Sequence, residues 1–243
     1  MKDKLAMLLT LICSITVFSQ EIKTDTWRLY YLGGQSNMDG YGYNSQLPDS
    51  LNKTFERVYI FHGNPVGDNG KNGGVGNWKK LQPGHGVGFS SNSSNNSYSD
   101  RFGVELSFAS KLQQLYPKEK FAIIKYSRGA TSLDSLASYA GLWDPDFSGS
   151  NQYDHFLTTL KNALIAKDID KDGVEDILIP QGIIWMQGES DAVFTEEVAG
   201  KYHFHLKRMM KLQRAAFRNN ELPFVVGKIS DSYSNGDGKV WDY

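Results

Sequence analysis

Residues 27–40 read WRLYYLGGQSNMDG, an apolar run that ends in two glycines and a short polar turn. The aromatic and aliphatic residues Trp27–Leu32 are typical of a buried strand. Gly33 and Gly34 allow a tight turn from the strand into a helix, and Ser36 lies at the exit of that turn. The turn alone leaves two interpretations open: Ser36 presents a reactive hydroxyl at the edge of a sheet, or it only caps a helix.

The rest of the chain repeats this order of strand and helix. Further β-branched or aromatic runs lie at residues 57–61, 121–127, 177–186 and 223–229. Apolar residues at helical spacing lie between them, at residues 104–115, 156–164 and 195–209. Strands that alternate with helices predict a parallel sheet with helices on both faces. The predicted fold is therefore α/β, a three-layer α/β/α sandwich around a five-stranded parallel sheet, in a single domain.

The overall composition is that of a globular protein without a disulfide framework. Hydrophobic residues make up 40% of the 243 residues and charged residues 22%, which excludes intrinsic disorder and collagen-like repeats. Lysine and arginine total 26 against 27 acidic residues, and this net charge of −1 argues against a nucleic-acid partner. A single cysteine excludes a disulfide scaffold and a cysteine-based zinc finger.

The N-terminus has the pattern of a secretory signal peptide over residues 1–19. Lys2 and Lys4 supply the charged start, and Leu5–Phe18 is an apolar run too short to span a bilayer as a stable helix. Cleavage after this segment would leave a domain over residues 20–243 that is secreted or periplasmic and has no membrane attachment. The alternative is a buried N-terminal helix.

Two further polar segments directly follow predicted strands. Residues 127–132 read SRGATS, and residues 185–191 read WMQGESD. In a parallel α/β sheet, ligands bind beyond the carboxyl ends of the strands, so we expect these segments to meet the Ser36 turn. Gly129 can present a backbone N–H to a developing oxyanion, and Gln187 can donate a side-chain amide proton to it. Three strand ends thus offer one nucleophile and two donors.

These three motifs, in this order and spacing, resemble those of the SGNH hydrolase superfamily, above all the branch with carbohydrate esterase family six and the sialate O-acetylesterase domain. Residues 103–105 (GVE) also resemble a Gly-x-Glu element of that branch, and the similarity covers residues 27–229. The resemblance implies a flavodoxin-like fold, catalysis without a metal and removal of acetyl groups from sugars. It also implies that Ser36 is the nucleophile and that the Ser36 and Gly129 amides form the oxyanion hole with Gln187.

Polar residues near the predicted nucleophile are expected to support it rather than to react. They are Gln35, Asn37, Glu105, Glu189 and Asp191. Glu189 can hold the oxyanion loop by hydrogen bonds or touch the substrate, and the first role is favoured. Glu105 can cap its helix, where a carboxylate is stabilising, or support the turn that carries the nucleophile.

The acid and base of the predicted reaction do not stand where the resemblance expects them. It implies an Asp-x-x-His element after the fifth strand, and residues 230–243 contain no histidine. We therefore expect the domain to lack its C-terminal part, with the catalytic histidine and its aspartate beyond residue 243. Without that part, we expect Val225 or Val226 to be exposed on a sheet face. If the base is already present, His62 and His85 are the first candidates, although contact with substrate is the favoured role for both.

Residues 62–100 interrupt the alternation with a stretch rich in Gly, Asn and Ser. A structureless stretch of this length is usually a functional loop or a mobile insertion, and both interpretations stay open. Its aromatic residues Trp78, His85, Phe89 and Tyr98 are candidates for contact with a sugar.

An aspartate-rich segment, DIDKDGVED at residues 168–176, resembles a calcium-binding loop. Asp168, Asp170 and Asp172 alternate, a glycine follows at the sixth position, and Asp176 stands at the ninth. The twelfth position is isoleucine instead of a bidentate glutamate, which argues against a complete EF-hand. A structural calcium ion and an acidic surface turn both remain open. No cofactor is expected for catalysis.

The main prediction from the sequence is an exported carbohydrate O-acetylesterase that forms a serine acyl-enzyme on an acetylated carbohydrate. Acetylxylan-like polysaccharide is the first candidate substrate, and acetylated sialic acid is the second. Two alternatives remain. One is a non-catalytic carbohydrate-binding relative of the same fold, and the other is a related esterase that acts on lipid or peptidoglycan esters.

Overall fold

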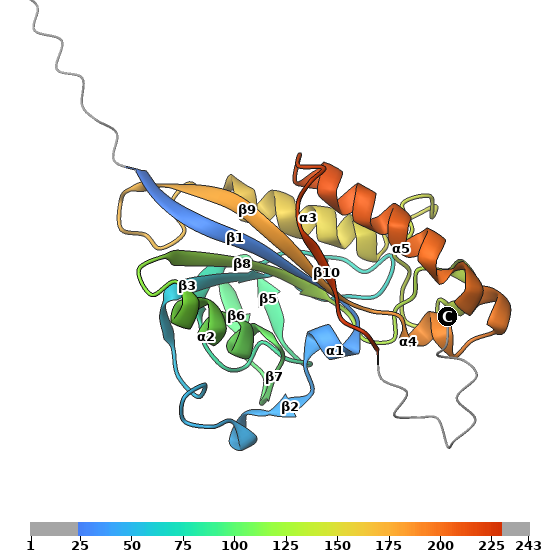
Figure 1. Ribbon diagram of the computed structural model, residues 1–243, viewed down its shortest axis with the longest axis horizontal. Helices are drawn as coiled ribbons and strands as arrows, with labels where there is room; N and C mark the ends of the chain where they lie inside the picture. The colour runs from blue at the N-terminus through green and yellow to red at the C-terminus, as the bar shows by residue number, and fades with distance from the viewer. Residues whose placement is uncertain (1–23, 230–243) are drawn as a thin grey trace, which may run out of the picture.

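A six-stranded sheet forms the middle layer of the molecule in a computed structural model that describes residues 24–229 (Figure 1). Across the sheet the order is β10 (Phe224–Val226), β9 (Glu175–Met186), β1 (Thr24–Gly34), β8 (Lys120–Ser127), β3 (Phe55–His62) and β4 (Trp78–Leu81). Five neighbouring strands are parallel, and β4 at one edge runs antiparallel to β3. The predicted signal peptide, residues 1–19, lies outside the described residues.

Helices cover both faces of the sheet, as the alternation of strands and helices predicted. α3 (Gln152–Ile165) and α5 (Glu196–Ala216) lie on one face, and α2 (Glu105–Leu115) lies on the other (Figure 1). At the start of α5, the Thr195 hydroxyl accepts the Val198 N–H, which satisfies one of the free donors of the first turn. The three-layer α/β/α sandwich is confirmed.

Each face of the sheet packs against its own hydrophobic cluster. Trp27, Leu29 and Tyr31 of β1 pack into the cluster under α3 and α5. Tyr30 and Leu32 pack into the cluster under α2. Successive strand residues point to opposite faces, so the continuous apolar sequence of β1 supplies both clusters, as expected for a strand buried on both sides.

β1 is the central parallel strand. It lies between β8 and β9, so the carboxyl ends of these three strands adjoin at one edge of the sheet. A flavodoxin order, 2-1-3-4-5, would place the first strand between the second and third, whereas here the third parallel strand, β8, separates β1 from β3. The chain leaves β1 toward β3 on one side and later reaches β9 on the other. The carboxyl end of β1 is therefore a switch point of the kind where open α/β sheets bind ligands.

Residues 62–100, expected to be a structureless stretch, contain three short strands. β4 extends the main sheet, and β5 (Ser90–Asn92) pairs with β6 (Asn95–Ser97) in a small hairpin. Trp78 at the start of β4 is buried, and its indole N–H donates to the Ala163 carbonyl at 3.0 Å. Trp78 is therefore a core residue and cannot make the sugar contact suggested for it.

Shorter elements complete the described chain. They are α1 (Ser36–Asp39), β2 (Gly42–Tyr43), 3₁₀ helices at Asn44–Gln46 and Ser135–Ala137, β7 (Arg101–Phe102) and α4 (Glu189–Ala192). β2 pairs with β7 in an antiparallel ribbon. Within residues 24–229, no helix is both long enough and apolar enough to cross a bilayer.

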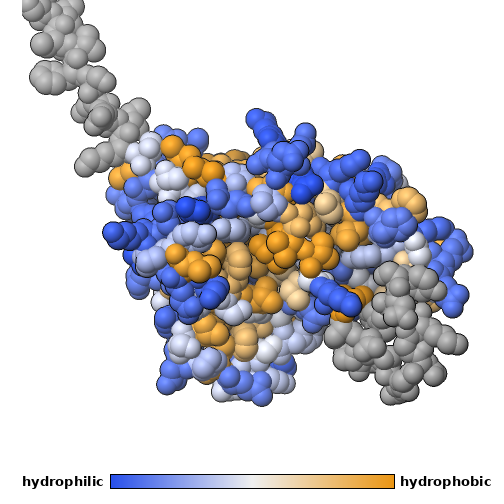
Figure 2. Space-filling model, in the orientation of Figure 1, coloured by the Kyte–Doolittle hydropathy of each residue, from blue (hydrophilic) through white to orange (hydrophobic). Residues whose placement is uncertain are grey.

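The expected exposure of Val225 and Val226 is confirmed. On β10, at the edge of the sheet, Val225 is 59% exposed and Val226 is 40% exposed. The neighbouring strand β9 also exposes Ile177 and Ile179. Figure 2 shows hydrophobic side chains gathered over the part of the sheet where Figure 1 draws β9 and β10. Ile184 and Met186 of β9 pack against the cluster under α2, while Ile177 and Ile179 of β9 and Val225 of β10 stay exposed.

Candidate active site

The turn after β1 presents Ser36 at the carboxyl edge of the sheet, beside the end of β9. The Gln35 N–H donates to the Met186 carbonyl at 2.8 Å, which ties the turn to β9. Gly34 makes this close approach possible. Its φ is +142°, and a β-carbon there would lie 2.0 Å from the Met186 carbonyl oxygen. α1 then begins at Ser36, so the strand-to-helix turn that the two glycines predicted is present.

Two predicted supporting residues tie this turn to the segment that follows β9. The Gln35 side-chain carbonyl accepts the Gly188 N–H at 3.2 Å. The Asn37 amide donates to the Glu189 carboxylate. Glu189 thus stabilises the turn through a hydrogen bond, which fits the supporting role favoured for it.

The turn after β8 brings Gly129 next to Ser36. The Arg128 N–H donates to the Gly34 carbonyl at 3.2 Å, which joins the two turns. A β-carbon at Gly129 would lie 3.6 Å from the Ser36 β-carbon and 3.4 Å from a carboxylate oxygen of Asp39. The Gly129 backbone therefore lies close enough to Ser36 for its predicted role in an oxyanion hole.

Gln187 is held by hydrogen bonds inside the protein. Its side chain is buried, and its amide nitrogen donates to the Thr131 carbonyl at 3.0 Å and to the Asp191 carboxylate at 2.6 Å. A primary amide has two N–H protons, and both are used here. In this structure Gln187 supports the loop after β8, and donation to an oxyanion would require one of these bonds to break.

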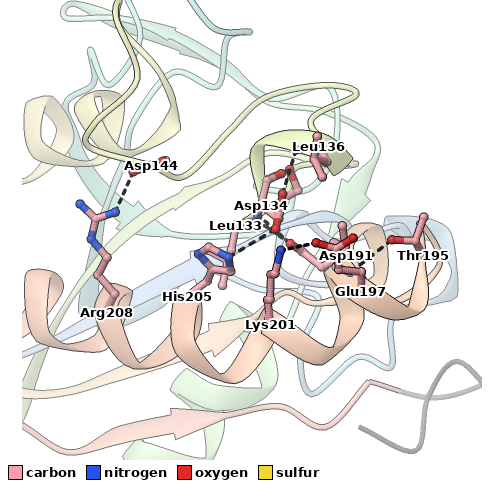
Figure 3. Close-up of polar contacts among 12 residues, drawn as sticks. Leu133, Asp134, Leu136, Asp144, Asp191, Thr195, Glu197, Lys201, His205 and Arg208 are labelled. Atoms are coloured by element: carbon pink, nitrogen blue, oxygen red, sulfur yellow. Dashed lines mark hydrogen bonds and ion pairs between the residues drawn. The ribbon is translucent and has the colours of Figure 1, made fainter.

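The Asp191 carboxylate is the shared acceptor of the hydrogen bonds that hold the loop after β8 (Figure 3). Its buried carboxylate accepts the Leu133 N–H at 3.1 Å and the Asp134 N–H at 2.8 Å, in addition to the Gln187 amide. Burial raises the pKa of Asp191, against the opposing effect of these donors. Asp191 therefore fastens the loop that follows Gly129 to α4, an arrangement that fits its predicted supporting role.

A buried ion pair lies behind the turn after β1. The Lys125 ammonium is 2.8 Å from the Glu105 carboxylate, and both side chains are fully buried. The same ammonium donates to the Asp39 carbonyl at 2.9 Å and to the His85 carbonyl at 2.8 Å. Glu105 also accepts the Gly103 N–H at 2.8 Å. Glu105 therefore supports the turn through Lys125, the second of the two roles considered for it.

These turns border one cleft of about 1050 Å³. Its walls come from the ends of β1, β8 and β9 and from the segment that follows β3. Five of the predicted site residues line it: Gln35, Ser36, Asn37, Gly129 and Glu189. The buried Glu105, Gln187 and Asp191 do not line it and act on it through the contacts described above.

Four cleft residues carry functional groups to which the sequence motifs assigned no role. They are Asp39, Tyr41, Arg128 and Ser190. Asp39 is 9% exposed, and burial raises the pKa of its carboxyl. The sequence could have pointed to these residues only through their position, because each stands in or just after a turn at the carboxyl edge of the sheet. The motifs assigned roles to the neighbouring Ser36, Gly129 and Gln187 instead.

His62 and His85 form a buried pair at one wall of the cleft. Their Nδ1 atoms are 3.3 Å apart, and both rings stack on Phe89. Burial lowers the pKa of His62 well below its usual range and that of His85 to about 3, so both rings are neutral near pH 7. His62 and Phe89 line the cleft, whereas His85 is fully buried behind them.

The remaining described histidines lie on helices. His155 of α3 contacts the Gly67 carbonyl, and His205 of α5 contacts the Asp134 carboxylate. His203 also lies on α5, beside Phe204. Within residues 24–229, the structure therefore pairs no histidine with Ser36.

The aspartate-rich segment folds into a turn before β9. The two carboxylate oxygens of Asp168 accept the backbone N–H groups of Lys171, Asp172 and Gly173. Asp176 accepts the Trp27 indole N–H at 2.5 Å and the Ile169 N–H at 2.6 Å. Many of the carboxylate oxygens of the segment thus already accept hydrogen bonds from the protein itself.

Two triads of carboxylates in and around this segment are close enough to share a cation. They are Asp168 with Asp170 and Asp176, and Asp25 with Asp170 and Asp172, each with oxygens within 4.8 Å of one another. The Lys120 ammonium already pairs with Asp25, and it lies 3.3 Å from Asp170. A calcium ion would compete with this ammonium, and calcium binding stays a prediction.

The sequence model of one family, described as "Carbohydrate esterase, sialic acid-specific acetylesterase", matches residues 26–242. No curated protein sequence matches the chain.

Several solved structures resemble this one, and three of them are described here. A "novel carbohydrate acetylesterase" from Xanthomonas citri has a TM-score of 0.53 and 18% identity, over 83% of this chain and 41% of that chain. A protein from Arabidopsis thaliana has a TM-score of 0.55 and 17% identity, and the match covers 83% of this chain and 74% of that chain. NanS has a TM-score of 0.54 and 19% identity, and the match covers 84% of this chain and 67% of that chain. The chain spans less than half of the Xanthomonas structure, and at these identities the likeness shows the fold alone.

Proposed function

The chain belongs to the carbohydrate esterase family of sialic acid-specific acetylesterases, and on this premise we propose that it removes acetyl groups from sugar hydroxyls through a serine acyl-enzyme. The observation that carries the proposal is the position of Ser36 at the carboxyl end of the central strand, beside Gly129 and in a cleft. The description of the family favours acetylated sialic acid over acetylxylan as the substrate.

In the proposed reaction, the Ser36 hydroxyl attacks the acetyl carbonyl and loses its proton to a general base. The backbone N–H groups of Ser36 and Gly129 stabilise the oxyanion that develops on the carbonyl oxygen. The sugar hydroxyl leaves with a proton, and water then releases acetate from the acetyl-serine. The resemblance assigns the base to a histidine oriented by an aspartate, which no contact among residues 24–229 supplies.

We also propose that the protein acts outside the cytoplasm. The support for this is the charged and then apolar pattern of residues 1–19, which lie outside the described residues.

Two serine substitutions within the cleft test whether Ser36 is the nucleophile. Ser36→Ala is expected to lower acetate release from O-acetylated sialic acid by several orders of magnitude, because covalent catalysis is lost. Ser190 also lines the cleft, so Ser190→Ala is a matched control that removes a hydroxyl from the same space and should keep most of the rate. In the unmodified protein, a fluorophosphonate should label Ser36, which intact and peptide mass spectrometry would show.

If Ser36→Ala keeps more than about a tenth of the rate, or Ser190→Ala loses as much as it does, the assignment is wrong. The second candidate function is sugar binding without catalysis, which is favoured by the lack of a histidine partner for Ser36 within residues 24–229. It predicts calorimetric binding of the sugar, no acetate release from any substrate, and no labelling by the fluorophosphonate.

A further inference from the structure

Asp39 is a buried carboxylate that the proposed reaction does not use. It is the last residue of α1, three positions after Ser36, so the two side chains lie on the same face of this short helix. Asp39 lines the cleft, although only 9% of the residue is exposed. A buried carboxylate is costly unless a cation or hydrogen bonds stabilise its charge. The partners of Asp39 therefore decide whether it needs a further one.

The cations in this part of the cleft wall are bound elsewhere. Lys125 donates to the backbone carbonyl of Asp39 at 2.9 Å, but its ion pair is with Glu105, at 2.8 Å. Arg128 directly follows β8, and its Nε–H donates to the Ala140 carbonyl at 3.0 Å. Within residues 24–229, neither cation forms an ion pair with the carboxylate of Asp39.

Two neighbouring donors are imperfectly placed for the carboxylate. Burial raises the pKa of Asp39, and the nearby Ser127 hydroxyl and Gly129 N–H oppose the rise. Neither of them is aligned for a full hydrogen bond, and the buried Ser127 hydroxyl has no partner within residues 24–229. The proposed reaction uses the Gly129 N–H for the oxyanion, so Asp39 loses one of these two donors when substrate is in place. The complex then needs a new donor beside Asp39, because a buried acceptor left unpaired costs free energy.

The space beside Asp39 adjoins the reacting centre. A β-carbon at Gly129 would lie 3.4 Å from Oδ2 of Asp39 and 3.6 Å from the Ser36 β-carbon, so the carboxylate and Ser36 border the same small space. The Tyr41 hydroxyl lies 3.3 Å from that point, and among the described residues it donates no hydrogen bond to Asp39. A group of the ligand that lies next to the ester is therefore placed to supply the donor.

We propose that Asp39 accepts a hydrogen bond from a free hydroxyl on the carbon next to the acetyl ester, and so selects sugars that carry one acetyl group on a pair of neighbouring hydroxyls. The inference rests on the proposed function and deepens it, because it adds the acetylation pattern to the substrate. A hydroxyl has the proton that an ionised carboxylate requires, whereas a second acetyl ester has none. A site built around such a hydrogen bond rejects a ligand that lacks it.

The first test compares two esters with the unmodified protein. One is a sialic acid with one O-acetyl group and a free hydroxyl on the neighbouring carbon. The other is its deoxy analogue, in which hydrogen replaces that hydroxyl. Each kcat/KM is divided by the rate constant for hydroxide-catalysed hydrolysis of the same ester, because the hydroxyl also activates the leaving group. We expect this corrected rate to favour the hydroxyl by roughly 10- to 100-fold, as for a hydrogen bond to a charged group.

Substitutions of Asp39 show whether the preference comes from this carboxylate. In Asp39→Ala the preference should fall to near one, through a lower rate with the hydroxyl substrate. Asp39→Asn should lie in between, because the amide keeps an acceptor oxygen and loses the charge. Asp146→Ala is a control with the same loss of charge. Asp146 pairs with Arg208 and does not line the cleft, so the preference should stay unchanged.

A purely structural role of Asp39 gives a different result. If Asp39 only stabilises the turn of α1, Asp39→Ala lowers kcat/KM for both esters equally, and this result overturns the proposal. Equal corrected rates for the two esters with the unmodified protein overturn it as well. That comparison decides by itself if the variants do not fold.

A binding measurement separates this proposal from the proposed function. Calorimetry with the two deacetylated sugars, one with the neighbouring hydroxyl and one without it, requires no turnover. If neither ester is hydrolysed, the proposed function fails, but tighter binding of the sugar with the hydroxyl, abolished in Asp39→Ala, still supports the contact. Equal affinities in that case overturn the proposal too. If both esters are hydrolysed at the same corrected rate, the proposal alone fails.

Discussion

The amide of Gln187 has two protons, and both are donated inside the protein. One bond reaches a carbonyl of the loop after β8, and the other reaches the buried carboxylate of Asp191. An oxyanion donor needs a proton directed into the cleft, whereas Gln187 does not line the cleft. At the scale of single residues, Gln187 therefore holds the loop after β8, and the oxyanion hole that we propose relies on the backbone N–H groups of Ser36 and Gly129.

Gln187→Ala is expected to destabilise the protein as well as slow it. The substitution leaves the Thr131 carbonyl unpaired and takes one donor from Asp191, and each buried group left without a partner costs about 1–3 kcal/mol. Urea denaturation would measure the loss in free energy of unfolding. Gln213→Ala is a control, since Gln213 is buried and its side chain has no hydrogen-bond partner within residues 24–229. Unchanged stability with a kcat lower by about 10²–10³ would instead identify Gln187 as an oxyanion donor.

At the scale of elements, one lysine connects four segments that meet behind Ser36. Lys125 lies on β8, and its ammonium contacts α2 through Glu105, α1 through the Asp39 carbonyl and the long segment after β3 through the His85 carbonyl. A fully buried charge requires this number of partners, because an uncompensated one is very costly. Lys125 therefore helps to hold the Ser36 turn against α2, together with Met38, which packs in the same cluster as Leu106.

Lys125→Met is expected to lower the free energy of unfolding by about 3–5 kcal/mol, because it leaves the Glu105 carboxylate buried without its cation. Chemical denaturation followed by tryptophan fluorescence would measure this. The double variant Lys125→Met with Glu105→Gln removes both charges and should be more stable than Lys125→Met alone. A loss below about 1 kcal/mol in the single variant would mean that water reaches the pair and that the described burial is incorrect.

At the scale of the whole molecule, the buried histidine pair makes stability depend on pH. Burial holds the pKa of His85 at about 3 and that of His62 well below its usual range, while an unfolded histidine titrates near pH 6.5. Below that pH the unfolded state binds protons that the folded state excludes, so the free energy of unfolding decreases as the pH falls. Above it both states are neutral at these rings, and the contribution is constant.

Between pH 7 and pH 4.5, the free energy of unfolding is expected to fall by about 2–3 kcal/mol through His85 alone, at 1.36 kcal/mol for each pH unit below 6.5. His85→Phe removes the titrating ring, so its pH dependence should be less steep even if the variant is less stable throughout. The raised pKa values of Asp39 and Asp191 act in the opposite sense at acidic pH, because the folded state then binds more protons than the unfolded one. Equal slopes for both proteins would show that His85 is accessible to protons.

The local sequence by itself determined the strands and the turn that carries Ser36. Each of the five parallel strands coincides with a β-branched or aromatic run, and Gly34 precedes Ser36 because only glycine tolerates the close contact with Met186. The sequence did not predict β4, because four residues at a sheet edge form a strand only when a partner such as β3 is in place. The five parallel strands depend on residue types that are adjacent in the chain, which a sequence displays directly, whereas β4 depends on its pairing with β3.

Only the tertiary structure decided what each polar side chain does. Gln187 and Lys125 find their partners in other elements, and Arg128 is notable for the acidic partner that the described chain does not provide. The strand order also belongs to this level, since β8 instead of β3 lies beside β1. The physical reason is that a hydrogen bond or an ion pair acts over a few ångströms in space, whatever the separation of its two residues along the chain.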